Sequence, residues 1–349
     1  MELVQTYAPV SRPENPTCSV CIANYNGLSL LNECLKSVMN QSGELDLEII
    51  VHDDASTDES VSYLRKNFPN ISILASTENV GFCVSNNRMV EFARGKYILL
   101  LNNDAALESN AIETLLTASQ AQPSEGILTL PQYDWKTDVL VDRGCFLDPF
   151  HNPVPNLDIG RVDVAMVIGA CMFMPRKLWH DLGGFPTWLE SIAEDMYLCC
   201  AARLQGIPVQ VTRDSRYRHL QGKSFGGNRA DSGRLSTTFR RRRLSERNKT
   251  AVLLVCTPTA LVWPLFGLHM ACLILEGAAL TLIQRNTRIW KDIYAPVFSF
   301  LRSNGRSILV RRKGMQQKRN ASLRSYANTF VPLPQKLRLF FKHGLPTIR

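Results

Sequence analysis

Acidic and amide side chains stand near the ends of apolar runs in the first third of the chain, where they could bind a ligand. The run YILLL is followed at once by Asn102, Asn103 and Asp104, and the run LEIIV is followed closely by Asp53 and Asp54. Two other apolar runs, CSVCIA and ISILA, lead into the polar or glycine-containing segments NYNG and NVGF. Each segment is either a simple surface turn or part of a ligand site at the end of a strand.

The elements that carry these polar ends alternate between two periodicities. CSVCIA, LEIIV, ISILA and YILLL have the length and composition of short buried strands, and apolar residues recur at helical spacing between them. Ser56 and Glu59 are spaced as a capping box at the start of one helix. This alternation predicts an α/β fold with a doubly wound, mostly parallel sheet. Such a sheet binds ligands at the carboxyl ends of its strands, so four polar ends on one rim favour a site.

Composition narrows the class of protein. The chain has 349 residues, is 45% hydrophobic and carries a net charge of +9, which would suit nucleic acid, an anionic membrane or a phosphorylated substrate. The N-terminus lacks a signal-peptide pattern, so we expect a cytosolic start and reduced thiols for the ten cysteines. The fingerprints of dinucleotide and P-loop sites are missing from the sequence.

The C-terminal third places a basic run beside an apolar run. FRRRRLSERNK lacks interleaved aromatic residues, so we expect no nucleic-acid partner. Residues 251–283 are apolar apart from interruptions such as Pro264 and Glu276, and both flanks are basic, which disfavours a single membrane crossing. We predict a peripheral or re-entrant helical pair on anionic lipid at the cytoplasmic face of the cell membrane. The alternative is a helical hairpin packed against the core or in a homo-oligomer.

Five segments, in order, resemble glycosyltransferase family 2, which has the GT-A fold, and within it the bacterial rhamnosyltransferase-like members that build polysaccharides. The resemblance covers about residues 18–250. These segments are SVCIANYNG, VHDDASTDES, ENVGFCVSNNRMVEFARGKYILLLNNDA, IGACMFMPRKLWHDLGGF and AEDMYLCCAARLQG. It implies inverting transfer of a sugar, such as rhamnose, from a UDP- or dTDP-linked donor to a lipid-linked or polysaccharide acceptor. It also implies a divalent cation, Mg²⁺ or Mn²⁺.

The resemblance implies roles for residues around the donor. Asp104 is expected to bind the metal together with His219, although Asn102 replaces the first acid of the family's D-x-D motif and leaves one carboxylate. Asn102 would support the ribose or a metal-bound water, and Asn103 would lie in the same donor site. Asp104 could instead cap the next helix, and His219 could be a surface histidine. Gly222, Lys223 and Ser224 follow in a stretch suited to closing over phosphates.

The nucleobase and the acceptor have their own candidates. Asp53 is expected at the nucleobase, in a pocket lined also by Ala23, Asn24 and Tyr25. Asp195 is expected to be the general base, with Glu194 orienting the acceptor or its loop; acids at a helix start can also be simple caps. Asn86 and Asn87 lie one turn into the helix after Gly81. They either order the donor site or stabilise the fold.

The predicted organisation is a tail (1–17), a glycosyltransferase domain (18–239, with donor and acceptor halves 18–110 and 111–239), a helical membrane-associating region (240–300) and a basic tail (301–349). Two other functions compete with sugar transfer. A nucleotidyltransferase would need a basic, glycine-rich loop near the N-terminus, and NYNGLSLLNE has one glycine and no basic residue. A non-catalytic sugar-nucleotide-binding protein at the membrane is the other alternative.

Overall fold

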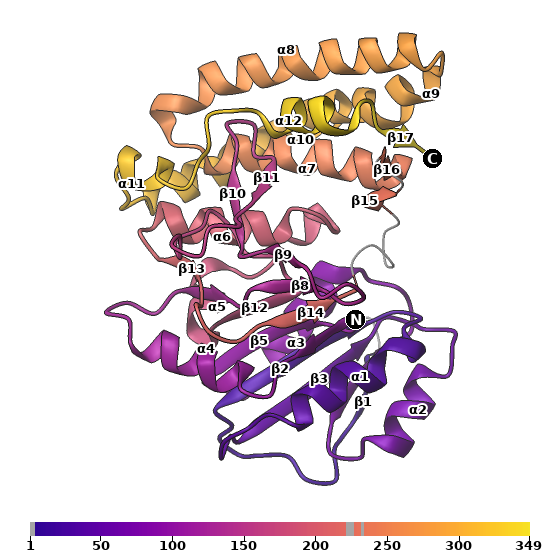
Figure 1. Cartoon of the computed structure of the whole chain (residues 1–349), viewed down its shortest axis with the longest axis vertical. Helices are drawn as coiled ribbons and strands as arrows, with labels where there is room; N and C mark the ends of the chain where they lie inside the picture. The colour runs from indigo at the N-terminus through magenta and orange to yellow at the C-terminus, as the bar shows by residue number, and fades with distance from the viewer. Residues whose placement is uncertain (1–3, 221–226, 232–233) are drawn as a thin grey trace. The chain divides into compact units, whose positions relative to one another are not determined.

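The computed structural model describes residues 4–220, 227–231 and 234–349, which form two compact units (Figure 1). The first unit consists of Met1–Cys145, Pro155–Ala202 and Ile207–Leu220. The second consists of Phe146–Val154, Arg203–Gly206 and Gln221–Arg349. The predicted site residues that the structure describes all lie in the first unit.

The first unit contains an eight-stranded sheet in the order β1-β4-β3-β2-β5-β12-β7-β13. The central strands β4, β3, β2 and β5 are parallel, and β12 runs antiparallel between β5 and β7. The predicted doubly wound, mostly parallel sheet is confirmed. Its strands are β1 (Val4–Tyr7), β2 (Cys18–Asn24), β3 (Leu47–Asp53), β4 (Ser72–Ser76), β5 (Tyr97–Asn102), β7 (Ile127–Thr129), β12 (Cys171–Pro175) and β13 (Val209–Val211).

Helices cover both faces of this sheet. Helices α1 and α2 share one face because the connections from β2 to β3 and from β3 to β4 step in the same direction, whereas the connection to β5 reverses and places α3 on the other face. On α1, Leu31, Cys34, Leu35 and Val38 are buried in the main core at helical spacing. The helices are α1 (Leu28–Met39), α2 (Ser60–Asn67), α3 (Phe82–Phe92), α4 (Ala111–Gln120), α5 (Arg176–Leu182), η1 (Thr187–Leu189) and α6 (Glu194–Leu204).

A second sheet joins segments that are far apart in the sequence. Its order is β6-β14-β8-β9, and β14 pairs antiparallel with β6 and parallel with β8. The segment 131–165 contributes short strands to this sheet and to the pair β10–β11. Their bounds, with β6 and β14, are β6 (Ala105–Leu107), β8 (Gln132–Asp134), β9 (Leu140–Asp142), β10 (Cys145–Leu147), β11 (Pro153–Pro155) and β14 (Tyr217–His219).

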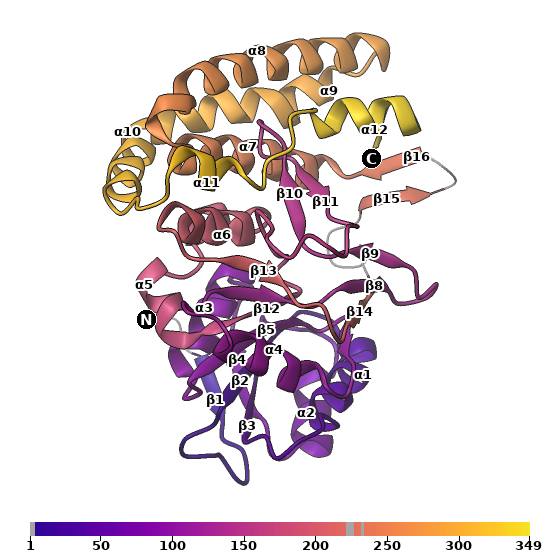
Figure 2. The same cartoon turned by 60° about the vertical axis from the view of Figure 1, so that its left-hand side comes forward.

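The second unit is mainly helical. Helices α8 and α10 both pack on α7, as Figure 2 shows. Residues 301–349, which we expected to be a basic tail, contain the rest of α10 and two further helices. The elements are β15 (Gly227–Asp231), β16 (Arg234–Thr237), α7 (Phe239–Cys256), α8 (Thr259–Ile283), α9 (Thr287–Ile289), η2 (Trp290–Tyr294), α10 (Ala295–Gln317), α11 (Leu323–Ala327), α12 (Gln335–His343) and β17 (Thr347–Ile348).

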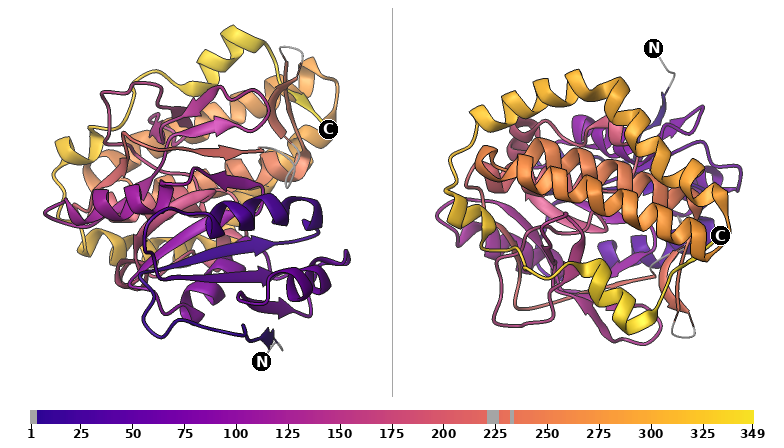
Figure 3. Two further views of the ribbon diagram at one scale, coloured as in Figure 1. Left: turned by 60° about the horizontal axis from the view of Figure 1, so that its bottom comes forward. Right: turned by 90° about the horizontal axis from the view of Figure 1, so that it is seen from above.

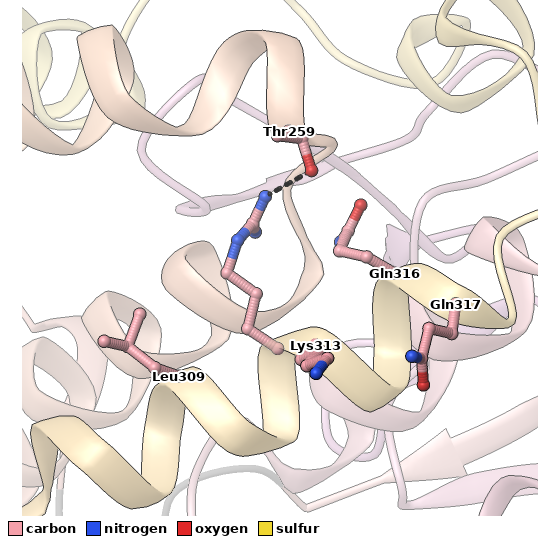
Figure 4. A pocket seen from close by; sticks show the side chains of 6 residues that line it. Thr259, Leu309, Lys313, Gln316 and Gln317 are labelled. Carbon is pink, nitrogen blue, oxygen red and sulfur yellow. Dashed lines mark hydrogen bonds between the residues drawn. The ribbon is translucent and has the colours of Figure 1, made fainter.

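The junction between α7 and α8 is held by Arg312 of α10. Its Nη1 donates to the carbonyl oxygens of Leu254 and Thr257 at 2.7 and 2.6 Å, and its Nη2 donates to the Thr259 hydroxyl at 3.1 Å. The guanidinium thus satisfies carbonyls at the end of α7 that have no helical partner. A cavity of about 440 Å³ adjoins this junction (Figure 4), lined by Thr259, Leu309, Arg312, Lys313, Gln316 and Gln317. It lies in the second unit, so it is not the predicted donor site.

Three local predictions have different outcomes in the structure. Residues 4–7, placed in the N-terminal tail, form the edge strand β1, which pairs antiparallel with β4. The predicted capping box is wrong. Helix α2 begins at Ser60, and the Ser60 amide donates to the carboxylate of Asp58. All ten cysteines lie in the described part of the chain and are free thiols, as expected.

Candidate active site

The polar strand ends meet at one edge of the sheet. The parallel register sets Asn24 opposite Asp53, and Ala23 opposite Asn102. The ends of β2, β3 and β5 are therefore neighbours, as the doubly wound topology requires. Asp54, the next residue after β3, binds the fourth polar turn. Its carboxylate accepts the amides of Val80 and Gly81 at 2.7 and 2.9 Å, while burial raises its pKa.

A chain of buried side chains connects these strand ends. Asn24 Nδ2 donates to Asp53 Oδ2 at 2.9 Å, and Asn103 Nδ2 donates to Asn24 Oδ1 at 2.8 Å. Asp53 Oδ1 also accepts the Ser56 amide at 2.9 Å. Each Asp53 oxygen thus has one donor in this arrangement and can accept a second. Gly27 lies against the chain, and a Cβ atom there would be 2.1 Å from Asn103 Nδ2.

Asp104 and His219 face each other because β6 and β14 pair with Ala105 opposite His219. His219 Nε2 lies 3.0 Å from Asp104 Oδ1 and 3.4 Å from Asn102 Nδ2. Within the described part of the chain, Asp104 Oδ1 has no hydrogen-bond donor, so its approach to Nε2 is close but not in hydrogen-bonding geometry. The structure therefore brings together the two residues that we predicted as metal ligands.

Gln132, which our sequence reading missed, orients this imidazole. Its Oε1 lies 3.3 Å from His219 Nδ1 and accepts the Tyr217 hydroxyl at 2.6 Å. A carboxamide oxygen only accepts, so Nδ1 carries the hydrogen and Nε2 turns its lone pair toward Asp104. No motif in the sequence singled out Gln132. Nearby, burial raises the pKa of Asp142 to about 7, against the opposing effects of the Gly144 amide and His219.

These two side chains fit a divalent cation held mainly by a bound ligand. Two neighbouring ligands of an octahedral cation, each about 2.1 Å from it, are about 3.0 Å apart, which is the separation between Nε2 and Oδ1. Among the described residues no group of three or more His, Cys, Asp or Glu side chains could hold a metal ion. Asp104 and His219 would therefore leave most coordination positions to the oxygens of a diphosphate and to water.

Asp195, the predicted base, lies at the start of α6 and is tied to the same edge of the sheet. Its Oδ2 accepts the Gly169 amide at 3.2 Å, and its Oδ1 accepts the amide of Met196 at 2.7 Å. The residue after Gly169 is Ala170, whose carbonyl accepts the Asn102 amide at 3.1 Å. Two consecutive residues thus connect Asp195 to the end of β5.

The loop that leads into Glu194 and Asp195 has an unusual backbone. Glu190, Ile192 and Ala193 have φ angles of 63°, 71° and 70°, in the left-handed region that residues other than glycine rarely adopt. Each such residue costs about 1–3 kcal/mol and persists only where surrounding contacts fix it, which is common at functional sites. Glu194, which is 6% exposed, follows directly as the first residue of α6.

Asn86 and Asn87 make contacts that stabilise the fold. Asn86 Nδ2 donates to the Phe82 carbonyl within α3 at 2.8 Å. Asn87 holds Phe185 from both sides, because its Nδ2 donates to the carbonyl at 2.7 Å and its Oδ1 accepts the amide at 2.9 Å. Asn87 thereby anchors the loop that ends at Asp195. A direct role of either residue in the donor site stays a prediction.

The remaining candidates differ in exposure. Ala23 is partly exposed and lies opposite Asn102, whereas Tyr25 is 53% exposed just beyond β2. Both are placed to line a pocket at this edge, and that role stays a prediction. Gly222, Lys223 and Ser224 lie outside the described residues.

Comparisons with known proteins show which family this chain resembles. Residues 19–183 match the family described as glycosyl transferase family 2. A poly(ribitol-phosphate) beta-glucosyltransferase of Bacillus spizizenii is 29% identical over 208 residues, which are 58% of this chain and 32% of that protein. A chondroitin synthase of Pasteurella multocida is 26% identical over 200 residues, 52% of this chain and 18% of that protein. The chain thus spans a third or less of the length of these relatives.

Solved structures show the same fold at low identity. GalNAc-T7, crystallised with UDP, GalNAc and Mn²⁺, aligns with a TM-score of 0.54 at 15% identity, over 69% of this chain and 48% of that chain. The mannosyltransferase PcManGT from Pyrobaculum calidifontis, in complex with GDP-Man and Mn²⁺, aligns with a TM-score of 0.50 at 18% identity, over 89% and 88%. The chain thus has the GT-A fold and, over residues 19–183, the sequence pattern of glycosyl transferase family 2.

Proposed function

We propose that the chain transfers a sugar, with inversion, from a UDP- or dTDP-linked donor to a lipid-linked or polysaccharide acceptor in cell-surface glycan synthesis. The observation that carries this proposal is the meeting of Asp104 and His219 beside the Asp53–Asn24–Asn103 chain at the carboxyl ends of three parallel strands. A divalent cation bound there would neutralise charge that develops on the leaving diphosphate. Rhamnose is the donor sugar that the family resemblance favours.

The donor side has two parts. Asp104 and His219 would hold the cation, and Asn102, whose amide lies beside His219, would contact the ribose or a metal-bound water. Asp53 would accept the N3–H of uracil or thymine with the free capacity of its carboxylate, in a pocket shared with Ala23 and Tyr25. Support for a nucleotide and a metal comes from the two fold relatives, whose structures contain UDP or GDP-Man with Mn²⁺.

The acceptor side depends on Asp195. As the acceptor oxygen attacks the anomeric carbon and the bond to the diphosphate breaks, the hydroxyl proton passes to the Asp195 carboxylate. The Gly169 amide and the fixed loop before α6 hold that carboxylate beside the end of β5. Glu194 would orient the acceptor or the loop. We place the reaction at the cytoplasmic face of the membrane, because α8 is a long, apolar and largely exposed helix.

The test measures release of nucleoside diphosphate from a panel of UDP-, dTDP- and GDP-sugars with Mg²⁺, Mn²⁺ or a chelator. We expect turnover of a UDP- or dTDP-sugar that requires the metal. Asp195→Asn should lower turnover by about 10²–10⁴-fold, and Asp104→Ala should abolish the metal response. Asp181→Asn, which removes an exposed carboxylate on α5, is the matched control. Full activity of Asp195→Asn would exclude it as the base, and a lack of turnover with every donor would refute sugar transfer.

A further inference from the structure

Helix α8 is apolar on nearly every side but buried along one stripe only. In the described part of the chain it is the one helix long and apolar enough to cross a membrane, and 22% of its most apolar 18-residue stretch is buried. The buried stripe is Val262, His269, Leu273, Gly277 and Leu280. The exposed large side chains are Leu261, Trp263, Leu268, Ile274, Leu275, Leu282 and Ile283.

Helix α12, in the segment that we expected to be a basic tail, is a second exposed apolar element. None of its residues is buried. Leu337 and Phe340 are each 48% exposed and Phe341 is 82% exposed, while Arg338 and Lys342 are exposed cations between and after them. An exposed pair of phenylalanines flanked by cations is the composition of a helix that lies in a membrane interface.

Ion pairs fix α12 beside α8. Lys336 Nζ, at the start of α12, lies 2.6 Å from Glu276 Oε2 of α8 and 2.9 Å from Glu246 Oε1 of α7. Arg242 of α7 also pairs with Glu276, at 2.6 Å. Seen from above, neither α8 nor α12 is covered by another part of the second unit (Figure 3, right). Both helices are therefore open on the side from which this view is taken.

The same contacts exclude a membrane-crossing α8. Arg242 lies on α7 beside Glu276, which stands seven residues before the end of α8, and Arg243 follows Arg242 in the chain. A crossing α8 would bring this arginine-rich part of α7 to the depth of the hydrocarbon, where each charge costs several kcal/mol. Gly277 also packs closely on Trp290 and Tyr294, which holds α8 along the body of the unit.

The charge of the chain is divided very unevenly. Residues 239–349 contain 21 Lys and Arg but three Asp and Glu, a formal charge of +18, whereas the preceding 238 residues carry −9 in a chain of net +9. The exposed cations at the ends of the two helices include Arg285, Arg288, Lys291, Arg338 and Lys342. A second copy of the chain would bring another basic surface to this face, whereas an anionic bilayer complements it.

We propose that the exposed sides of α8 and α12 form one interfacial surface on an anionic lipid bilayer, with Phe340 and Phe341 inserted beside the length of α8. This deepens the proposed membrane location, on which it rests, by naming α12 as the second membrane element. Apolar burial drives the insertion, and the surrounding lysine and arginine side chains select acidic headgroups.

The test is sedimentation of the full chain with vesicles of phosphatidylcholine alone and with 30% phosphatidylglycerol. We expect binding to the anionic vesicles that weakens with salt. The variant Phe340→Ser with Phe341→Ser should bind at least about ten-fold more weakly. The double control Val10→Ser with Val139→Ser removes equally exposed apolar side chains from the first unit and should bind like the unaltered protein.

Two further readouts keep the outcomes separate. Trp263 fluorescence should be quenched by brominated lipid acyl chains, and Trp263→Phe should remove that signal. Donor turnover without vesicles should be unchanged in the Phe340–Phe341 variant, so loss of vesicle binding alone does not touch sugar transfer. If that variant binds vesicles as well as the unaltered protein, the role of α12 is overturned. If the unaltered protein does not bind vesicles but forms a dimer in solution, and the variant is monomeric, the surface contacts a second copy instead.

Discussion

At the scale of residues, the candidate metal site at Asp104 and His219 depends on the orientation of the His219 imidazole. Two acceptor-type groups surround the His219 ring, Gln132 Oε1 on the Nδ1 side and Asp104 Oδ1 on the Nε2 side. Since the hydrogen resides on Nδ1, Nε2 carries the free lone pair that a metal ion would need. The Tyr217 hydroxyl, bonded to the same Oε1, keeps the Gln132 amide from rotating.

Gln132→Leu should therefore weaken Mn²⁺ binding about 10–100-fold, because partners of a metal-binding histidine contribute on that scale. Electron paramagnetic resonance titration of free Mn²⁺, with and without UDP, measures this without reference to catalysis. Gln132→Glu keeps an acceptor oxygen facing Nδ1 and serves as the control, with affinity at or above that of the unaltered protein. Equal affinity in Gln132→Leu and the unaltered protein would leave His219 oriented by other contacts.

The sequence predicted the polar residues of this corner but not its geometry. Asn102, Asn103 and Asp104 follow a recognisable buried strand, so their place on the rim follows from the rule for parallel sheets. Gln132 stands 87 residues before its partner His219 in the chain, and no local pattern connects them. Contacts between distant segments depend on strand pairing that only the folded chain reveals.

At the scale of elements, the turn after β2 allows side chains at the ends of neighbouring strands to contact each other. The strands β2, β3, β4 and β5 were predicted because each is a short apolar run bounded by polar turns. The pairing of β6 with β14 was not, because three-residue strands have too few positions to show a period. The turn itself depends on Gly27, where the close approach of Asn24 and Asn103 leaves no room for a side chain.

Gly27→Ala should break the hydrogen bond from Asn103 Nδ2 to Asn24 Oδ1. The new Cβ atom would lie 2.1 Å from Asn103 Nδ2 and 2.4 Å from Asn24 Oδ1. We expect a loss of about 1–3 kcal/mol in the free energy of unfolding, with weaker donor binding. Urea denaturation and calorimetric titration with UDP measure the two effects. Gly305→Ala, in α10 where nothing lies within 4 Å of the added carbon, should be neutral or stabilising by up to about 1 kcal/mol. If Gly27→Ala changed neither the free energy of unfolding nor the affinity for UDP, the turn would have room for the added Cβ atom.

At the scale of the whole molecule, the helical second unit was the least predictable part. Composition identified the basic and apolar runs, but α12 was assigned to a tail because its nine residues form a short, mostly exposed helix with a strongly charged sequence. Its position depends on Lys336 meeting two carboxylates from α7 and α8, which is a tertiary contact. The division of charge between the two parts of the chain concerns its partners rather than its fold.

Both units should lose stability in mild acid for the same reason. His52 on β3 and His151 in the second unit are buried, and burial lowers the pKa of each to about 4. In the described part of the chain neither ring nitrogen of His151 has a hydrogen-bond partner, which suits a neutral ring. Because the pKa in the unfolded chain is about 6.5, the unfolded state binds more protons between pH 6.5 and 4. The free energy of unfolding is thus fully present above pH 6.5 and falls as the pH drops toward 4.

The expected loss is up to about 3 kcal/mol for His52, which corresponds to roughly 2.5 pKa units. Calorimetric unfolding at pH 7.5, 6.5, 5.5 and 4.5 should show this slope, and His52→Gln should flatten it for the first unit because an amide does not titrate in this range. His180→Gln replaces an exposed histidine on α5 and should leave the slope unchanged. A slope that is the same in His52→Gln and in the unaltered protein would show that His52 takes up no extra proton on unfolding, so burial does not lower its pKa.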